Sequence, residues 1–352
     1  MKTKSDYTLC KWCSERQHIR ISDFKKIGKD CQICNGLWNH IDQSCNKIIQ
    51  ATKNYQYDTF LIGLTLDHSF YDNEDKFRSR FKIRGKENIK TSLLREIRKK
   101  FSNFSNKKSN LHSPDITINV QIGRKFETKV SVKSSTLILR GRYNKMKRFQ
   151  IKTKNSTNDR LEINQRHIEK ILKKEISHQF NSDSIVFWPL GKEEPESLVL
   201  GKGRPFYVSI KNSKKISFKQ GFSINSNGIL FKLIDKVSAL PTSAPLYAKK
   251  VLTLVSFQEK METIHFNNLI DSGIIIVELV KKKSKNWKLI YQMDFKIKTQ
   301  RKLELIMTCD NGLPVRRFIE GEGDDISPTL DQILGMKCHC DKIDILDIFN
   351  EE

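Results

Sequence analysis

Two Cys-x-x-Cys pairs near the N-terminus constrain the fold of this chain more than any other feature. The first motif contains Cys10 and Cys13, and the second contains Cys31 and Cys34. Residues 14–30 lie between the two motifs. Each pair presents two thiolates to one side of a metal ion, and zinc takes four such ligands in a tetrahedron. A redox dithiol needs only one pair. The spacing therefore predicts a structural zinc site with no open position for catalysis.

The other cysteines and the N-terminus favour a metal site over a disulfide framework. Five of the eight cysteines fall within the first 45 residues, and the opening Met-Lys-Thr-Lys-Ser is no signal peptide. No apolar run reaches the ~18 residues of a membrane span. Cys45 and His18 are spare ligand candidates. We therefore expect a soluble, cytoplasmic protein that does not bind membranes, with residues 1–50 as its zinc-binding segment.

The charge of the chain indicates a polyanionic partner. The net charge is +24 with an isoelectric point near 9.6, and 352 residues are enough for two or three domains. Neutralising phosphates releases counterions and so strengthens binding. The basic residues occur in blocks such as 145–148 and 281–283, which favours nucleic acid over a merely lysine-rich composition.

The segment at residues 51–158 has the pattern of an α+β module. Residues 91–101 place apolar side chains on one helical face and basic ones opposite, which suits an RNA-binding module. Short alternating or apolar runs predict the strands at residues 60–66, 116–120, 130–132 and 137–139.

A basic stretch follows the last of these strands. Arg140, Arg142, Tyr143 and Lys145 are the residue types that bind phosphates and stack on a base. The alternative is a solvated basic turn at the end of the strand. The following polar stretch predicts a domain boundary after residue 158.

Residues 159–352 form the second predicted domain. A helix is expected at residues 167–180 because its apolar positions share one face. Many strands with few helices indicate an antiparallel or mixed sheet with helices packed on a face. The expected strands are residues 197–200, 205–210, 252–255, 273–279, 287–298, 302–308 and 343–348, with a short helix at 329–334.

Several segments, taken in order, resemble one enzyme family. They include the paired Cys-x-x-Cys motifs, Ser113-Pro-Asp-Ile116, Gly141-Arg-Tyr-Asn-Lys145 and Gly201-Lys-Gly-Arg-Pro-Phe206. The family is the archaeal and eukaryotic tRNA pseudouridine synthases with an N-terminal zinc and a THUMP-containing region. In archaea it is associated with uridines 54 and 55 of the tRNA T-loop. The resemblance covers nearly the whole chain.

The resemblance implies a fold, a substrate and a reaction. The fold is α+β, with a zinc-binding, THUMP-like accessory region before a catalytic domain on a mixed, mainly antiparallel sheet. The substrate is tRNA, no organic cofactor is needed, and a monomer is expected. The target uridine is flipped out, and a carboxylate then acts at the sugar beside the anomeric carbon.

The resemblance also assigns site residues. Glu194 stands where the family has its catalytic aspartate, and Arg316 is its expected cationic partner. Lys192 replaces a family arginine, and Arg204 would support the substrate phosphates or the local fold. Other departures occupy the two family tyrosine positions, which here are Val251 and Pro314. Two interpretations follow: an active synthase with a glutamate, or a degenerate homologue that binds structured tRNA without turnover.

Overall fold

The structure is a computed structural model that describes most of the chain in two compact units. The described residues are 8–19, 31–150, 157–182, 184–217, 221–241, 246–262, 273–281, 284–321 and 325–350. The N-terminal unit comprises Met1–Thr136 with Phe180–Asp183 and Lys211–Ser217, and the C-terminal unit comprises Leu137–Gln179, Ser184–Ile210 and Phe218–Glu352. Parts of the predicted zinc segment (1–7 and 20–30) and of the basic block 281–283 lie outside the described residues.

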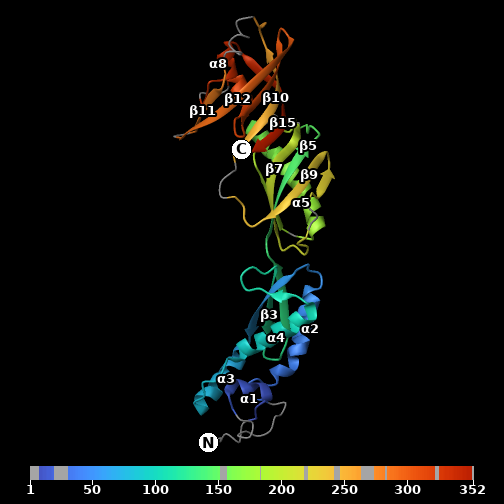
Figure 1. Ribbon diagram of the computed structural model, residues 1–352, viewed down its shortest axis with the longest axis vertical. Helices are drawn as coiled ribbons and strands as arrows, with labels where there is room; N and C mark the ends of the chain where they lie inside the picture. Colours follow the sequence, from blue (N-terminus) through green and yellow to red (C-terminus); the bar gives the residue numbers. More distant parts are fainter. Residues whose placement is uncertain are drawn as a thin grey trace. The chain divides into compact units, whose positions relative to one another are not determined.

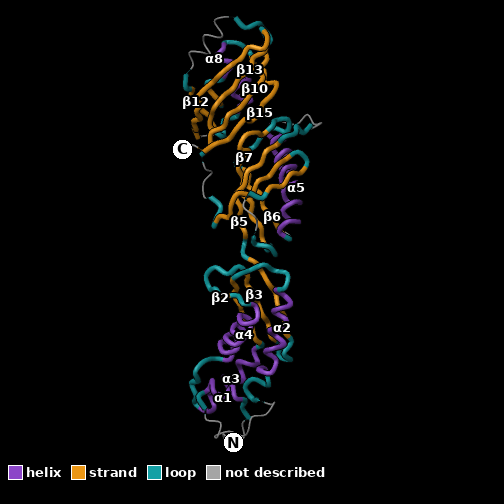
Figure 2. Tube along the Cα trace, turned by 45° about the vertical axis from the view of Figure 1, so that its right-hand side comes forward, coloured by secondary structure: helices purple, strands orange, loops and turns teal. Residues whose placement is uncertain are grey.

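The N-terminal unit is a four-stranded sheet with helices packed on one face (Figures 1 and 2). The strand order is β2-β1-β3-β4; β1 pairs with β2 and β3 in parallel, and β3 pairs with β4 antiparallel. Its elements are α1 (Lys11–Gln17), η3 (Leu37–His40), α2 (Ile41–Thr52), β1 (Thr59–Leu66), α3 (His68–Phe81), α4 (Ile89–Ser105), β2 (Lys108–Ser109), β3 (Ile116–Ile122) and β4 (Thr128–Ser134).

Periodicity explains the core of this unit. Alternate residues of β1 and β3 are buried, as the period of two in a strand requires. Leu93, Ile97 and Phe101 of α4 are buried at helical spacing, with Phe101 edge-on to Phe60 at 4.8 Å between ring centroids. Asn88 caps α4 by accepting a hydrogen bond from the Thr91 amide. The predicted strand at 60–66 and helix at 91–101 are therefore confirmed.

The C-terminal unit is built on a large sheet with helices against it. The described strands follow the order β14-β11-β12-β13-β10-β15-β7-β5-β9-β8, and β6 pairs with β7. The β15–β7 pair is parallel, whereas the neighbouring pairs of this sheet are antiparallel. The predicted α+β class with a mixed, mainly antiparallel sheet is confirmed. The elements are β5 (Leu137–Lys145), α5 (Thr157–Phe180), β6 (Ser184–Pro189), β7 (Val199–Lys211), β8 (Ser223–Ser226), β9 (Ile229–Val237), β10 (Tyr247–Phe257), β11 (Ile275–Lys281), β12 (Ser284–Thr299), β13 (Lys302–Asp310), α7 (Val315–Glu320), β14 (Ile326–Ser327), α8 (Leu330–Leu334) and β15 (Cys338–Asn350).

The structure differs from the sequence prediction around β5 and β7. The basic stretch, for which a solvated turn was the alternative to an RNA contact, continues strand β5 to Lys145. Because β5 pairs with β7 and β9, the compact C-terminal unit begins at Leu137, not after the polar segment that ends at residue 158. The predicted strands at 197–200 and 205–210 are one strand, β7.

Two glycines let β7 run through the expected turn. Gly201 and Gly203 have φ of 53° and 79°, a region that favours glycine. A Cβ on Gly203 would lie 2.7 Å from the Tyr143 carbonyl oxygen, so the close approach of β5 requires glycine there.

Among the described residues, no helix is long and apolar enough to cross a membrane.

Candidate functional site

The loop between β6 and β7 carries the predicted catalytic residue into the wall of a cavity. This cavity in the C-terminal unit has a volume of about 360 Å³, within the range of small-molecule sites, about 300–1,000 Å³. It is lined from this loop, from β10, from the start of α7 and from β15. Its lining residues are Leu161, Lys192, Glu193, Glu194, Ser197, Lys249, Val251, Leu313, Pro314, Val315, Arg316, Arg317, Ile343 and Ile345.

Glu193 anchors this loop in the interior. Its carboxylate accepts hydrogen bonds from Arg204 Nε at 2.7 Å and from the Tyr143 hydroxyl at 2.9 and 3.0 Å. The Asn164 amide donates to the Glu193 backbone carbonyl and side chain. Burial is the largest cause that raises the pKa of Tyr143 well above its ordinary value, so its hydroxyl stays a donor.

This arrangement corrects two predicted RNA contacts. Tyr143 is buried within an aromatic cluster and holds Glu193, so it does not present a ring to a base. Arg204 is also buried, and its guanidinium donates to the backbone carbonyls of Leu190 and Lys192 as well as to Glu193. Of the two roles considered for Arg204, the structure places it in support of the local fold.

Lys145 holds the segment beside the catalytic candidate. Its fully buried ammonium donates to the backbone carbonyls of Glu194 at 2.8 Å and Pro195 at 2.7 Å. Burial lowers its pKa to about 8, although the carboxylate of Glu193 favours the charged form. The prediction of Lys145 as an RNA contact is therefore wrong, because the side chain faces the interior.

Glu194 and Arg316 form a two-pronged ion pair at the cavity. Arg316 Nε and Nη2 each donate to one carboxylate oxygen at 2.7 Å. Arg316 Nη1 also donates to the Cys340 carbonyl at 2.6 Å, which fixes the guanidinium. The hydrogen bonds to Glu194 are the largest cause that raises the pKa of Arg316, so the arginine stays charged. The structure thus brings together the two residues predicted to act as a pair.

Apolar side chains form much of the remaining wall. Val251 and Pro314, at the family tyrosine positions, both line the cavity together with Ile343 and Ile345. The face of a flat heteroaromatic ring can pack on such a wall. Lys192, which stands at the position of a family arginine, also lines the cavity.

Lys249 is a cavity residue that the sequence analysis did not select. Its ammonium donates to the Leu313 carbonyl at 2.8 Å, and burial lowers its pKa. Lys249 could have been predicted from its position two residues before Val251, because alternate residues of a strand point to the same face.

Arg140 and Arg142 are in β5 and do not line the cavity. Arg140 makes a two-pronged ion pair with Asp235, at 2.7 and 3.0 Å. Arg142 donates to the carbonyls of Gly203 and Ile348, at 2.8 and 2.7 Å. Each guanidinium group therefore has hydrogen-bond partners within the unit, although the Arg140 side chain remains 45% exposed.

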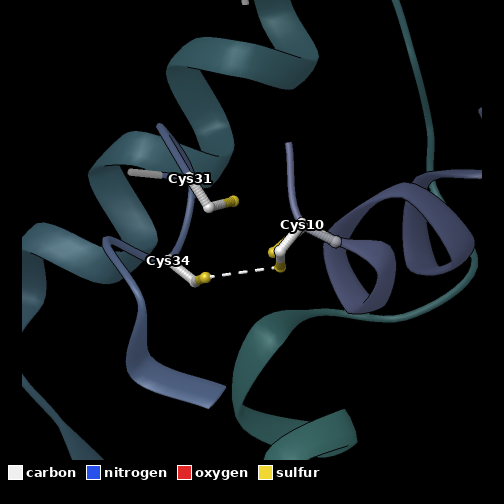
Figure 3. Close-up of side chains that lie close together, drawn as sticks. Cys10, Cys31 and Cys34 are labelled. Atoms are coloured by element: carbon white, nitrogen blue, oxygen red, sulfur yellow. Dashed lines mark hydrogen bonds between the residues drawn. The ribbon is translucent and has the colours of Figure 1, made fainter. Parts of the chain in front are cut away.

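The four cysteines of the paired motifs converge in the N-terminal unit. Their sulfur atoms all lie within 4.8 Å of one another, and the Cys10 and Cys34 sulfurs are 3.6 Å apart (Figure 3). In a tetrahedron with metal–sulfur bonds of about 2.3 Å, sulfurs are about 3.8 Å apart. Cys13, Cys31 and Cys34 are buried. The four residues therefore fit a metal ion, and the spare candidate Cys45 is outside this cluster.

A buried ion pair connects the cysteine cluster to the rest of the unit. Arg16 donates to the Cys13 sulfur at 3.6 Å and also to Glu74 of α3. Glu74 in turn accepts from Gln17 at 2.8 Å and from the Ile89 amide at 2.9 Å, at the start of α4. A cationic Arg16 at this position would balance the charge of metal-bound thiolates, as outer-shell groups of metal sites do.

Comparison with protein families identifies the class of both units. The family model "Pus10 THUMP domain, archaeal" matches residues 45–121, and the model "Pus10, C-terminal" matches residues 138–239. The first match falls on the N-terminal unit and the second on the part of the C-terminal unit that holds Glu193 and Glu194. These two domains in this order define a THUMP-containing, Pus10-type protein.

Whole-chain relatives agree with these domain matches. The chain is 28% identical to the tRNA pseudouridine synthase Pus10 of Nitrosopumilus maritimus, over 97% of this chain and 95% of that protein. It is 24% identical to the Pus10 of Pyrococcus furiosus, over 93% and 86%. The chain belongs to the Pus10 family. A chain in a crystal structure of a Cbf5–Nop10–Gar1 complex is similar over 51% of this chain and 46% of that chain, with a TM-score of 0.31 and 11% identity.

Proposed function

We propose that this protein is a tRNA pseudouridine synthase that acts on a uridine of the T-loop, position 54 or 55. The observation that supports it best is the Glu194–Arg316 pair in the wall of the 360 Å³ cavity. The membership of the chain in the Pus10 family and its net charge of +24 also favour an RNA substrate.

The reaction is an isomerisation. The bond from C1′ of the ribose to N1 of uracil breaks, the base rotates, and C1′ bonds to C5, which then loses its proton while N1 regains one. No atom is gained or lost, so no co-reactant is needed. The target base must leave its stack to enter the cavity, where Val251 and Pro314 would contact its flat face.

Glu194 is the proposed catalytic carboxylate. Each carboxylate oxygen has two lone pairs, so the two bonds from Arg316 leave one on each oxygen free to act at the sugar. Arg316 orients the group, and Lys145 fixes its backbone through the Glu194 and Pro195 carbonyls. Glu193 is not a candidate, because Arg204, Tyr143 and Asn164 already occupy its carboxylate.

The second candidate function is tRNA binding without turnover. Two observations favour it: both oxygens of Glu194 are engaged by Arg316, and aliphatic side chains occupy the family tyrosine positions. Without a ring to stack on, a flipped base would be held less firmly.

A single assay separates the two candidates. Purified protein is incubated with unmodified tRNA transcript, and pseudouridine is mapped at single-nucleotide resolution. We expect product in the T-loop, loss of product in Glu194→Gln, and tRNA affinity within a few-fold of the wild type. Glu196→Gln is the control, since Glu196 pairs with Arg160 and is not part of the cavity wall. No product at enzyme excess, with tRNA binding retained, would establish the second candidate.

The length of the side chain provides a sharper test of Glu194. Aspartate keeps the charge but withdraws the oxygens by about 1 Å from Arg316, a displacement that costs about 100-fold in rate. We expect Glu194→Asp to lose roughly that factor. Faster turnover in Glu194→Asp would mean that the site still has the geometry of an aspartate enzyme.

We also propose that the cysteine cluster holds a structural zinc ion. Cys10, Cys13, Cys31 and Cys34 would be its four ligands, and Arg16 would donate to one thiolate. Bound zinc would supply folding energy and no chemistry, because four protein ligands leave no position for substrate. Metal analysis of the purified protein should find one zinc ion per chain.

A further inference from the structure

Trp12 lies within the first cysteine motif, between Cys10 and Cys13, and is partly exposed. Its ring stacks on that of Trp38, with centroids 4.8 Å apart and an angle of 9° between planes. Trp38 is 7% exposed and belongs to the core of the unit, whereas Trp12 is 39% exposed. A rigid ring is thus fixed on a buried ring and still presents surface to solvent.

The environment of Trp12 restricts its motion. The adjacent cysteines belong to the four-cysteine cluster, and Trp38 lies in η3 (Leu37–His40), a short distance along the chain from Cys34 of the same cluster. A metal ion in the cluster would hold both rings in place. A fixed platform loses little conformational freedom on binding, which favours its use in recognition.

The exposed part of Trp12 suits a flat aromatic ligand. Trp38 covers one face of the indole, and Trp12 remains 39% exposed, so surface is left on which a further ring can pack. Lys11 precedes Trp12 in α1 and pairs with Glu15 one turn further along, at 3.9 Å, so the ring offers a ligand stacking alone. Stacking of a base on an aromatic side chain contributes substantially to affinity in single-strand RNA sites.

We propose that Trp12 is a stacking platform for an unpaired nucleotide of an RNA. A base within a duplex already has both faces covered, so an unpaired base offers the free face that this platform needs. The identification of the ligand as RNA rests on the proposed function together with the charge of +24. The geometry requires only a flat ring. This site belongs to the N-terminal unit and is separate from the Glu194 cavity.

Binding of short RNA tests the platform without depending on catalysis. The full chain is titrated with a 12-nucleotide single-stranded RNA and with a blunt-ended RNA duplex, while intrinsic tryptophan fluorescence and affinity are recorded. Trp12→Ala should bind the single strand about tenfold more weakly than the wild type. Trp12→Phe, which keeps an aromatic ring, should recover most of the affinity. Affinity for the duplex should change less than twofold.

Phe104→Ala is the matched control. Phe104 is in the same unit, at the end of α4, and is 65% exposed, more than Trp12. The Phe104→Ala variant should bind both RNAs with the affinity of the wild type. Metal content and far-ultraviolet circular dichroism establish that each variant is folded. If Trp12→Ala loses its metal, the comparison of Trp12→Phe with Trp12→Leu at full metal content decides the question.

Two outcomes would overturn the proposal. One is affinity of folded Trp12→Ala for the single strand within twofold of the wild type. The other is an equal loss for single strand and duplex, which would indicate a charge or folding effect. A wild type that makes no pseudouridine, yet loses single-strand affinity in Trp12→Ala, would contradict the proposed function and leave the platform standing.

Discussion

The carboxylate of Glu193 and the guanidinium of Arg204 form an ion pair that is almost completely enclosed, with side chains 2% and 1% exposed. The next residue, Glu194, directs its carboxylate to Arg316 in the cavity wall. Two adjacent glutamates therefore have separate tasks: Glu193 fixes the loop and Glu194 faces the cavity. This division yields a prediction about stability.

Arg204→Met should destabilise the C-terminal unit by about 3–5 kcal/mol, because it leaves a buried carboxylate without its cation. Urea unfolding of the variant and the wild type measures this difference. Adding Glu193→Gln should restore part of the stability. Arg140→Met is the control: its pair with Asp235 is 45% and 38% exposed and should contribute less than about 1 kcal/mol. Equal losses in both single variants would contradict the buried-pair account.

A second prediction concerns Lys145 and pH. Burial lowers its pKa to about 8 from 10.5 in an unfolded chain, so the unfolded state binds more protons between these two pH values. Its contribution to stability therefore rises with pH across that window and is lost as the pH falls through about 8. We expect the wild type to gain roughly 1 kcal/mol per pH unit relative to Lys145→Met from pH 8 to 10.

Denaturant unfolding at pH 7, 8, 9 and 10 provides the measurement. Lys170→Met, which removes an exposed lysine of α5, is the control and should leave the pH dependence of the wild type in place. If the free energies of unfolding of the wild type and Lys145→Met differ by the same amount at all four pH values, burial does not lower the pKa of Lys145.

Local patterns explain why much of the fold was predictable. The Cys-x-x-Cys spacing, the apolar run of β1 and the apolar face of α4 depend on a few neighbouring residues, and the structure has the cysteine cluster, the strand and the helix. The resemblance of several segments, in the same order, to an enzyme family predicted that Glu194 and Arg316 act as a pair, although 122 positions separate them in sequence.

Other features depended on contacts that no local pattern contains. Tyr143 and Lys145 were predicted to contact RNA because such residue types bind phosphates and stack on bases. For Arg204 the resemblance left two roles open, at the substrate phosphates or in the local fold. All three are buried because their polar groups have hydrogen-bond partners inside the unit. Tyr143 and Arg204 both donate to the Glu193 carboxylate, and Lys145 donates to a neighbouring backbone carbonyl. The role of Lys249 is likewise set by the distant Leu313 carbonyl.

A third prediction concerns metal removal. Cys31→Ser should lose zinc and lower the thermal stability of the N-terminal unit, because zinc binding contributes directly to folding. Cys45→Ser should retain one zinc ion per chain, since Cys45 is outside the four-cysteine cluster. Metal analysis and calorimetry check both variants. Full zinc content in Cys31→Ser would refute the four-cysteine assignment.

The final prediction concerns Arg316. Its guanidinium donates to both oxygens of Glu194 and also to the Cys340 carbonyl, a fork that one ammonium group cannot reproduce. Arg316→Lys keeps the charge but releases one carboxylate oxygen, so Glu194 is no longer held in one orientation. We expect about a 10–100-fold lower single-turnover rate of pseudouridine formation, with tRNA affinity within a few-fold. Arg166→Lys, on the exposed side of α5, should leave the rate unchanged. Loss of affinity with an unchanged rate for bound tRNA would instead assign Arg316 to substrate binding.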